Sequence, residues 1–136
     1  MDIKSFVTQA DRIFNCTGDP CDFGCHENKV AEKIAYVKKH LSGYLYCVVA
    51  DWIWIDINVT PENLKRFQVR GIKPSFVYAH KVIEDEAQRP FVSVRTTFLQ
   101  DFHENCIFLS RNTAYILCGK GTRVSIDPVV YAAVFS

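Results

Sequence analysis

The sequence predicts an α+β protein in which two N-terminal helices pack on an antiparallel sheet of about five to six strands. Two observations support this class. The helical part, residues 1–43, carries apolar residues at helical spacing, whereas the mainly β part, residues 44–136, contains runs of aromatic and β-branched residues. Helices followed by a series of strands favour a helical layer on one sheet. A chain of 136 residues can bury its own core, so a single domain is predicted.

Two helices are predicted in the N-terminal part. Apolar residues recur at helical spacing from about Ile3 to Phe14, and again from about Glu27 to Leu41. Basic residues in the last turn of the second stretch, followed by Gly43, favour a helix end there. The segment NCTGDPCDFGCHEN between the helices is rich in Gly, Asp, Asn and Pro, which predicts a loop.

The β part begins with a strand predicted from Tyr44 to Asn58, with a bend near Asp51. Thr60-Pro61 then indicates the start of a short helix, because threonine caps helices and proline suits the first helical position. This helix is predicted to end before Arg70. Further strands are predicted at 75–84, 91–102, 106–109 and 113–118, with one more strand from Arg123 and an ordered tail beyond Pro128.

The stretch SRNTAYILCGKGTR is predicted to contain two tight turns. Arg111-Asn112 joins two apolar runs, which is typical of a β-hairpin, and Asn112 tolerates left-handed geometry. Gly119 and Gly121 permit a second tight turn with Lys120 at its tip. GKGTR lacks the glycine spacing of a phosphate-binding loop and does not precede a predicted helix, so the pattern favours turns over a phosphate site.

Composition and charge exclude several classes of partner. The 16 basic and 15 acidic residues give a net charge of +1, which argues against nucleic acid as a partner. The longest apolar run, YLYCVVADWIWI, is too short to span a membrane. The N-terminus lacks the apolar segment of a signal peptide, so a cytoplasmic protein with reduced thiols is expected.

A cluster of potential metal ligands, Cys16, Cys21, Cys25 and His26, lies in the predicted N-terminal loop. Structural zinc sites favour two residues between paired cysteines, and adjacent Cys25 and His26 would strain one tetrahedron. The pattern therefore favours a loop with incidental thiols, and we predict no metal and no cofactor. A zinc-stabilised adaptor is the alternative interpretation.

The sequence offers little evidence for an enzyme. Paired carboxylates and the common hydrolase, metalloprotease and dinucleotide motifs are absent. Cys106 and His103 could form a nucleophilic pair, oriented by Asp101 or Glu104, only if a turn brings them to the same side. We therefore favour a protein without catalytic residues.

Partner binding is the functional class that the residues favour. Arg95, Arg111 and Arg123 could converge across neighbouring strands into a cationic patch for a carboxylate or phosphate. Trp52 and Trp54 share one face of a strand and belong to the core, or anchor a partner if exposed. The predicted partner-binding residues are Arg95, Arg111, Asn112, Lys120, Arg123, Trp52 and Trp54.

The segment YAHKVIED, the stretch VRTTF and the stretch SRNTAYILCGKGTR together carry a resemblance to a known family. This region resembles a small domain family of unknown function from Pseudomonas, related proteobacteria and their mobile elements. The matching residues are Tyr78, Ala79, His80, Val82, Asp85, Val94, Arg95, Thr96, Arg111, Asn112, Thr113, Tyr115, Leu117, Gly119, Gly121 and Arg123. The chain departs from the family pattern at Thr97-Phe98, Ser110 and Cys118.

The resemblance implies a phage, prophage or mobile-element accessory protein but no specific activity. Our hypothesis is a small non-enzymatic protein, a monomer or homodimer, that binds and inhibits a host protein, for example a bacterial antiviral defence component such as a CRISPR complex. One alternative is a small-ligand or nucleotide-binding protein, or an enzyme, that uses the arginine cluster. The zinc-stabilised adaptor is the other.

Overall fold

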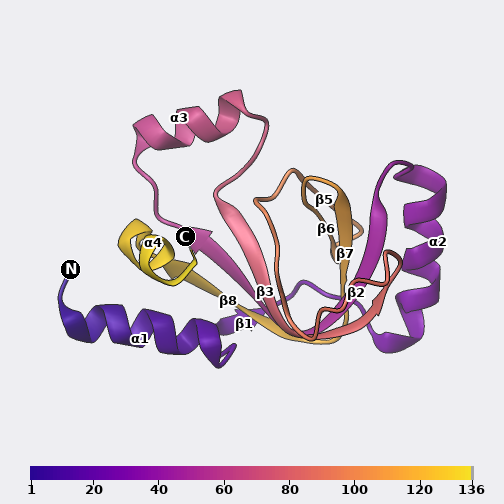
Figure 1. Cartoon of the computed structure of the whole chain (residues 1–136), viewed down its shortest axis with the longest axis horizontal. Coiled ribbons are helices and arrows are strands. Elements are labelled where there is room, and N and C mark those ends of the chain that lie inside the picture. The colour runs from indigo at the N-terminus through magenta and orange to yellow at the C-terminus, as the bar shows by residue number, and fades with distance from the viewer. Residues whose placement is uncertain (136) are drawn as a thin grey trace.

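The computed structural model describes residues 1–135, and this part of the chain forms four α-helices around one curled, mixed sheet of eight strands (Figure 1). The predicted α+β class is confirmed. The elements are α1 (Ile3–Phe14), β1 (Asp19–Cys21), the 3-10 helix η1 (Glu27–Lys29), α2 (Val30–His40), β2 (Leu45–Ile57), α3 (Pro61–Val69), β3 (Ser75–Asp85), β4 (Val94–Arg95), β5 (Asp101–His103), β6 (Ile107–Leu109), β7 (Thr113–Leu117), β8 (Gly121–Ile126) and α4 (Pro128–Phe135).

The long strand β2 organises the sheet. One edge of β2 pairs antiparallel with β3, while the other edge pairs in parallel with β7 along its first half and with β8 along its second half. The sheet continues from β8 to β1, from β7 through β6 to β5, and from β3 to β4. The predicted antiparallel sheet is therefore wrong, because the last strands of the chain return along β2 in its own direction.

A local irregularity at Asp51 bends β2, as predicted. Asp51 has a φ of 52°, and side-chain alternation changes parity there: Cys47 and Val49 share the inner core with Trp52 and Trp54. The register with β3 is unbroken across Asp51 and shifts only between Val48 and Val49, so the positive φ of Asp51 turns the strand without inserting a residue into β2. The bend allows one strand to follow β7 first and β8 afterwards.

Helices cover the outer side of the curled sheet in two separate places. α2 packs on the first half of β2 together with β6 and β7, whereas α1 and α4 pack on the second half with β3 and β8. Figure 1 shows these two groups at opposite ends of the molecule. The prediction that two N-terminal helices form one layer on the sheet is therefore wrong. α1 and α2 cover separate parts of the sheet, and α4 packs on the same part as α1.

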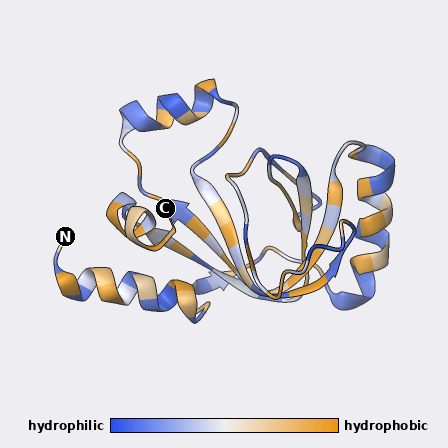
Figure 2. Ribbon diagram, in the orientation of Figure 1, coloured by the Kyte–Doolittle hydropathy of each residue, from blue (hydrophilic) through white to orange (hydrophobic). Residues whose placement is uncertain are grey.

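The predicted short helix is α3, which lies in the connection from β2 to β3. Thr60 Oγ1 accepts a hydrogen bond from the Asn63 amide at 3.2 Å, as expected of a helix cap. α3 stands apart from the sheet and is largely hydrophilic (Figures 1 and 2). The Phe67 ring contacts Phe98 edge-on, with centroids 5.0 Å apart, and fixes the helix against the β4–β5 connection.

The C-terminal segment differs from its prediction. The expected tail beyond Pro128 is helix α4 up to Phe135, and its last residue, Ser136, lies outside the described residues. Proline at the first helical position follows Asp127, whose carbonyl accepts from the amides of Val130 and Tyr131. This is the same type of helix start as Thr60-Pro61.

Candidate functional site

The predicted hairpin at Arg111-Asn112 is confirmed. β6 and β7 pair antiparallel, and the Ser110 amide donates to the Thr113 carbonyl at 3.0 Å across the turn. Two further bonds hold the turn: the Arg111 amide donates to Thr97 Oγ1, and the Asn112 carbonyl accepts from Leu45. Asn112 does not take the left-handed conformation that its position suggested.

The Gly119-Lys120-Gly121 segment is a bulge, so the predicted second tight turn is wrong. β7 and β8 both run parallel to β2, and the chain therefore keeps its direction. Val49 faces Leu117 and Ile53 faces Thr122, so this segment contains one residue more than β2 does over the same distance. Gly119 has a φ of 75°, which favours glycine.

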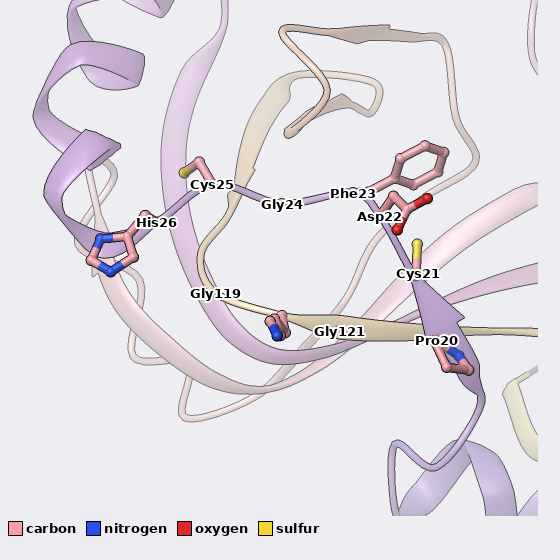
Figure 3. Close-up of a pocket in the computed structure, with 10 residues that line it drawn as sticks. Pro20, Cys21, Asp22, Phe23, Gly24, Cys25, His26, Gly119 and Gly121 are labelled. Carbon is pink, nitrogen blue, oxygen red and sulfur yellow. The ribbon is translucent and has the colours of Figure 1, made fainter.

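The cysteine-containing loop crosses this bulge and forms a pocket with it (Figure 3). This glycine-lined pocket has a volume of about 460 Å³ and is lined by Pro20 to His26 and Gly119 to Gly121. Backbone hydrogen bonds fasten the loop to the sheet. Gly24 donates to Asn105 at 2.9 Å, Cys25 donates to Leu117 at 2.9 Å, and Gly119 donates to Cys25 at 2.7 Å.

Close packing explains two glycines of the pocket. A Cβ atom at Gly24 would lie 2.4 Å from the Gly119 carbonyl oxygen, and one at Gly121 would lie 2.3 Å from Trp52 Cδ2. Trp52 is 1% exposed, and its Nε1 is the only buried side-chain nitrogen or oxygen in the described chain without a hydrogen-bond partner. The ring is therefore held beneath the pocket by packing.

The four candidate metal ligands do not converge. Figure 3 shows Cys21 and Cys25 at opposite ends of the loop. The Cys16 thiol donates to the Asp51 carbonyl at 3.3 Å, and His26 Nδ1 accepts from the Asn28 amide at the start of η1. Among residues 1–135, no three His, Cys, Asp or Glu side chains are arranged to hold a metal ion.

The suggested Cys106–His103 pair is also absent. A turn does separate the two residues, but His103 Nδ1 contacts the Tyr36 hydroxyl at 3.0 Å and its Nε2 contacts Asp101 at 2.9 Å. Burial, together with the neighbouring Cys25, raises the pKa of the Cys106 thiol to about 12. A thiol that stays protonated at neutral pH is a poor nucleophile.

The residues predicted to bind a partner fall into three groups. Two are exposed cations that are free within the described chain, three are exposed side chains with hydrogen bonds within the protein, and two are buried in the inner core. The free cations are Arg111 and Lys120, the bonded side chains are Arg95, Asn112 and Arg123, and the buried residues are Trp52 and Trp54.

The three arginines expected to converge do not form one patch of free guanidinium groups, because two of them have separate partners within the protein. Arg123, on the inner face of the sheet, binds Asp56 through Nε at 2.6 Å and lies over the Trp54 ring. Arg95 donates to the Phe135 carbonyl at the end of α4 and lies over that ring, on the outer face. Of these three, Arg111 alone has a guanidinium group without a partner among the described residues.

Arg111 instead shares a cleft with Arg70, which is not among the predicted partner-binding residues. This arginine cleft has a volume of about 420 Å³ and is lined by Arg70, Ile72, Thr97, Phe98, Gln100 and Arg111. Of the seven arginines in the chain, these two have no ion pair or side-chain hydrogen bond within the described residues. Each of the other five arginines has a partner. Arg12 binds Asp19, Arg66 binds Glu62, Arg89 binds Asp85, Arg123 binds Asp56, and Arg95 binds the Phe135 carbonyl.

A second depression adjoins the arginine cleft at Thr97. Its volume is about 380 Å³, and its border includes Phe91, Asn112 and Thr97. Phe91 is 44% exposed and the neighbouring Val92 82% exposed. We call the surface formed by Phe91, Val92, Thr97, Arg111 and Asn112 the turn face, because it surrounds the β6–β7 turn.

The fold and these sites define an α+β protein with a curled mixed sheet and a surface that presents free arginine and exposed apolar side chains. The chain belongs to the family described as a domain of unknown function, DUF6957, whose model matches residues 22–133. That match contains both the glycine-lined pocket, except for Pro20 and Cys21, and the arginine cleft. No curated protein and no solved structure matches the chain.

The family match confirms the resemblance to a domain family without an assigned function, while the expected organisms and signature stay predictions. Among the described helices, none is both long and apolar enough to cross a membrane.

Proposed function

We propose that this protein is a small, non-enzymatic binding protein whose turn face engages another protein. The observation that carries the proposal is the combination, on one face, of the free guanidinium of Arg111 with the exposed side chains of Phe91 and Val92. Arginine and aromatic residues are enriched at protein interfaces. Isolated exposed apolar residues are common, but here they adjoin two depressions and an unpaired cation.

Charge and chemistry support a protein partner over the alternatives. The net charge of +1 gives no extended basic surface for nucleic acid. The one nucleophilic pair that the sequence suggested is not formed: His103 contacts Tyr36 and Asp101, and the pKa of the Cys106 thiol is raised by burial. Binding of a protein partner requires the exposed side chains of the turn face and no catalytic group.

The more specific proposal is that the partner is a host protein and that binding inhibits it. This role rests on the sequence resemblance to phage, prophage and mobile-element proteins, and a bacterial antiviral defence component such as a CRISPR complex would be one such target. The expected compartment is the cytoplasm, in which the six free thiols would stay reduced.

The proposal is tested by affinity capture from a bacterial host lysate with the wild type, a Val92→Asp/Arg111→Glu variant and a Lys39→Glu control. Lys39 is an exposed cation on α2, so the control reverses a charge elsewhere. We expect a stoichiometric partner that the turn-face variant loses and the control retains. Capture of the same partner by the turn-face variant would contradict the proposal, as would turnover of a metabolite that depends on Arg111.

A second candidate, a small-ligand or nucleotide-binding protein, is favoured by the arginine cleft. Its two free arginines lie beside the Phe98 ring, an arrangement suited to an anionic ligand with an apolar part. A thermal-shift screen separates the candidates, because a ligand that binds only the folded state raises the unfolding temperature.

A further inference from the structure

We propose that the arginine cleft is a binding site for a phosphate monoester attached to an aromatic or otherwise flat apolar group. The site is not among those that the sequence suggested, since Arg70 enters it from the β2–β3 connection. The inference shares Arg111 with the proposed function but does not require a protein partner.

The Arg70 wall of the cleft is held in place by the end of α3. The Ile72 amide donates to the Phe67 carbonyl at 3.1 Å and the Gly71 amide to the Gln68 carbonyl at 3.0 Å, with a φ of 69° at Gly71. This bond pattern is a Schellman motif, a regular helix end. The chain that follows is fastened to the β4–β5 connection by Lys73, whose amide donates to the Leu99 carbonyl at 2.8 Å.

The Arg111 wall is fixed as firmly by the β6–β7 turn. The Arg111 amide donates to Thr97 Oγ1 at 3.2 Å, which joins the turn to the β4–β5 connection. The Gln100 amide donates to the Leu109 carbonyl at 2.8 Å and joins the same connection to β6. Both arginines are therefore carried by backbone that is set before a ligand binds, which reduces the entropy cost of binding.

The polar residues that line the cleft have hydrogen-bond donors to offer. Gln100 Oε1 accepts from the Tyr44 hydroxyl at 3.1 Å, so the group of this side chain that remains available to a ligand is its NH₂ donor. Thr97 Oγ1 accepts from Arg111, which leaves its hydroxyl hydrogen for a further acceptor. No carboxylate lines the cleft among the described residues. Two guanidinium groups in one depression without a counterion favour a bound anion.

Charge and donor number favour phosphate over carboxylate. A phosphate monoester carries a charge of roughly −1.5 to −2 at neutral pH and has three strong acceptor oxygens, which matches two arginines with the donors of Thr97 and Gln100. A single carboxylate would neutralise one arginine only. Each guanidinium presents a planar pair of donors that suits phosphate oxygens.

The floor of the cleft indicates what the phosphate is attached to. Phe98 is held between rings, 5.0 Å from Phe67 and 5.7 Å from Tyr131, and together with Ile72 it borders the cleft. An apolar group next to the phosphate would cover these side chains and gain from their burial. We therefore expect phenyl phosphate to bind more tightly than inorganic phosphate.

The test is isothermal titration calorimetry at low ionic strength with phenyl phosphate, inorganic phosphate and benzoate as probes. Proteins are the wild type, Arg70→Gln, Arg111→Gln and, as a matched control on α3, Arg66→Gln, whose guanidinium pairs with Glu62. We expect phenyl phosphate to bind best, and each cleft variant to bind it at least about tenfold more weakly, because hydrogen bonds to charged groups are strong. The Arg66→Gln control should bind as the wild type does.

Equal binding by wild type and both cleft variants, or no binding of phenyl phosphate at millimolar concentration, would overturn the inference. Tighter binding of benzoate than of phenyl phosphate would overturn the choice of phosphate. Further titrations with adenosine monophosphate and with a phosphotyrosine peptide distinguish the two sources of the group, a free nucleotide or a modified protein. Arg70 lies outside the turn face, so phenyl phosphate binding that is lost in Arg70→Gln, with protein capture unchanged in Val92→Asp/Arg111→Glu, would retain this inference and reject the proposed function.

Discussion

The glycine-lined pocket and the arginine cleft are similar in volume, about 460 and 420 Å³, but they use their polar groups in opposite ways. In the pocket, the amides of Gly24, Cys25 and Gly119 are bonded to backbone carbonyls, and a Cβ atom at Gly24 or Gly121 would clash with the protein itself. In the cleft, two guanidinium groups have no partner within the described residues.

This difference separates residues that maintain the fold from residues that are available to a ligand. The G-K-G pattern is the most conspicuous motif in the sequence, and its glycines are explained by a bulge and by contact with Trp52. Arg70 belongs to no motif, yet it borders a cleft and its charge is unpaired within the described residues. Unsatisfied hydrogen-bonding capacity is therefore a better guide to binding here than a recognisable pattern.

The largest expected effects come from filling the glycine positions of the pocket. Gly24→Ala should reduce the free energy of unfolding by about 3 kcal/mol or more, because its Cβ would meet a backbone oxygen at a φ of 114°. Gly121→Ala should cost about 2 to 3 kcal/mol through its clash with the buried Trp52 ring. Urea denaturation followed by tryptophan fluorescence measures both.

Gly119→Ala is the matched control for these two variants. Gly119 has a φ of 75°, but a Cβ atom there would meet nothing within 4 Å. We expect it to lose only about 1 to 2 kcal/mol, the cost of left-handed backbone for an ordinary residue. A loss in Gly121→Ala no larger than in Gly119→Ala would contradict the packing explanation.

The next effect concerns an arginine that is paired rather than free. Arg89 binds Asp85 through two bonds, Nε to Oδ2 at 2.7 Å and Nη2 to Oδ1 at 3.1 Å, and the Asp85 side chain is 3% exposed. Arg89→Gln would leave that carboxylate buried without its cation, although the Ala87 amide still donates to it, so we expect a loss of about 2 kcal/mol at pH 7. The exposed Arg66–Glu62 pair is the control, and Arg66→Gln should change stability by less than about 0.5 kcal/mol.

The pH dependence of Arg89→Gln tests the same explanation. Burial raises the pKa of Asp85, but the bonds from Arg89 and the neighbouring amides outweigh it, so the pKa lies below its ordinary value. A lowered pKa contributes stability above roughly pH 4, and this contribution disappears as the pH falls through the folded-state pKa. In the variant, the Asp85 carboxyl is buried without the Arg89 guanidinium, and burial favours its protonated form. The difference in unfolding free energy between wild type and variant should therefore shrink from pH 7 to pH 3, and a constant difference would contradict the role of Asp85.

The helices show how far local sequence signals reach. Both ends of α3 could be predicted, because a threonine cap with proline and the Gly71 helix end depend on neighbouring residues alone. α4 has a similar start at Asp127-Pro128, but its valine-rich sequence resembles a strand, so it was predicted as a tail. Packing against α1 and the sheet, which no local pattern contains, makes this segment helical.

Strand direction and the binding site both depend on distant pairing. The strand at residues 44–58 and its bend at Asp51 follow from composition, but the parallel pairing of β2 with β7 and β8 leaves no trace in side-chain periodicity. Arg111 could be predicted as exposed because it occupies a hairpin turn. Its proximity to Arg70 could not, because the two meet only after the β2–β3 connection and the β6–β7 turn are brought together by the sheet.

The smallest expected effect most directly tests the comparison between the glycine-lined pocket and the arginine cleft. Arg70→Gln/Arg111→Gln should change the free energy of unfolding by less than about 0.5 kcal/mol in dilute buffer, because neither guanidinium has a partner to lose. Added phosphate should then raise the unfolding temperature of the wild type more than that of the variant, since an anion bound only by the folded state stabilises it by mass action. General salting effects of phosphate act on both proteins and cancel in the difference. A variant that unfolds as easily as Arg89→Gln would show that the two arginines maintain the fold, and the distinction between cleft and pocket would fail.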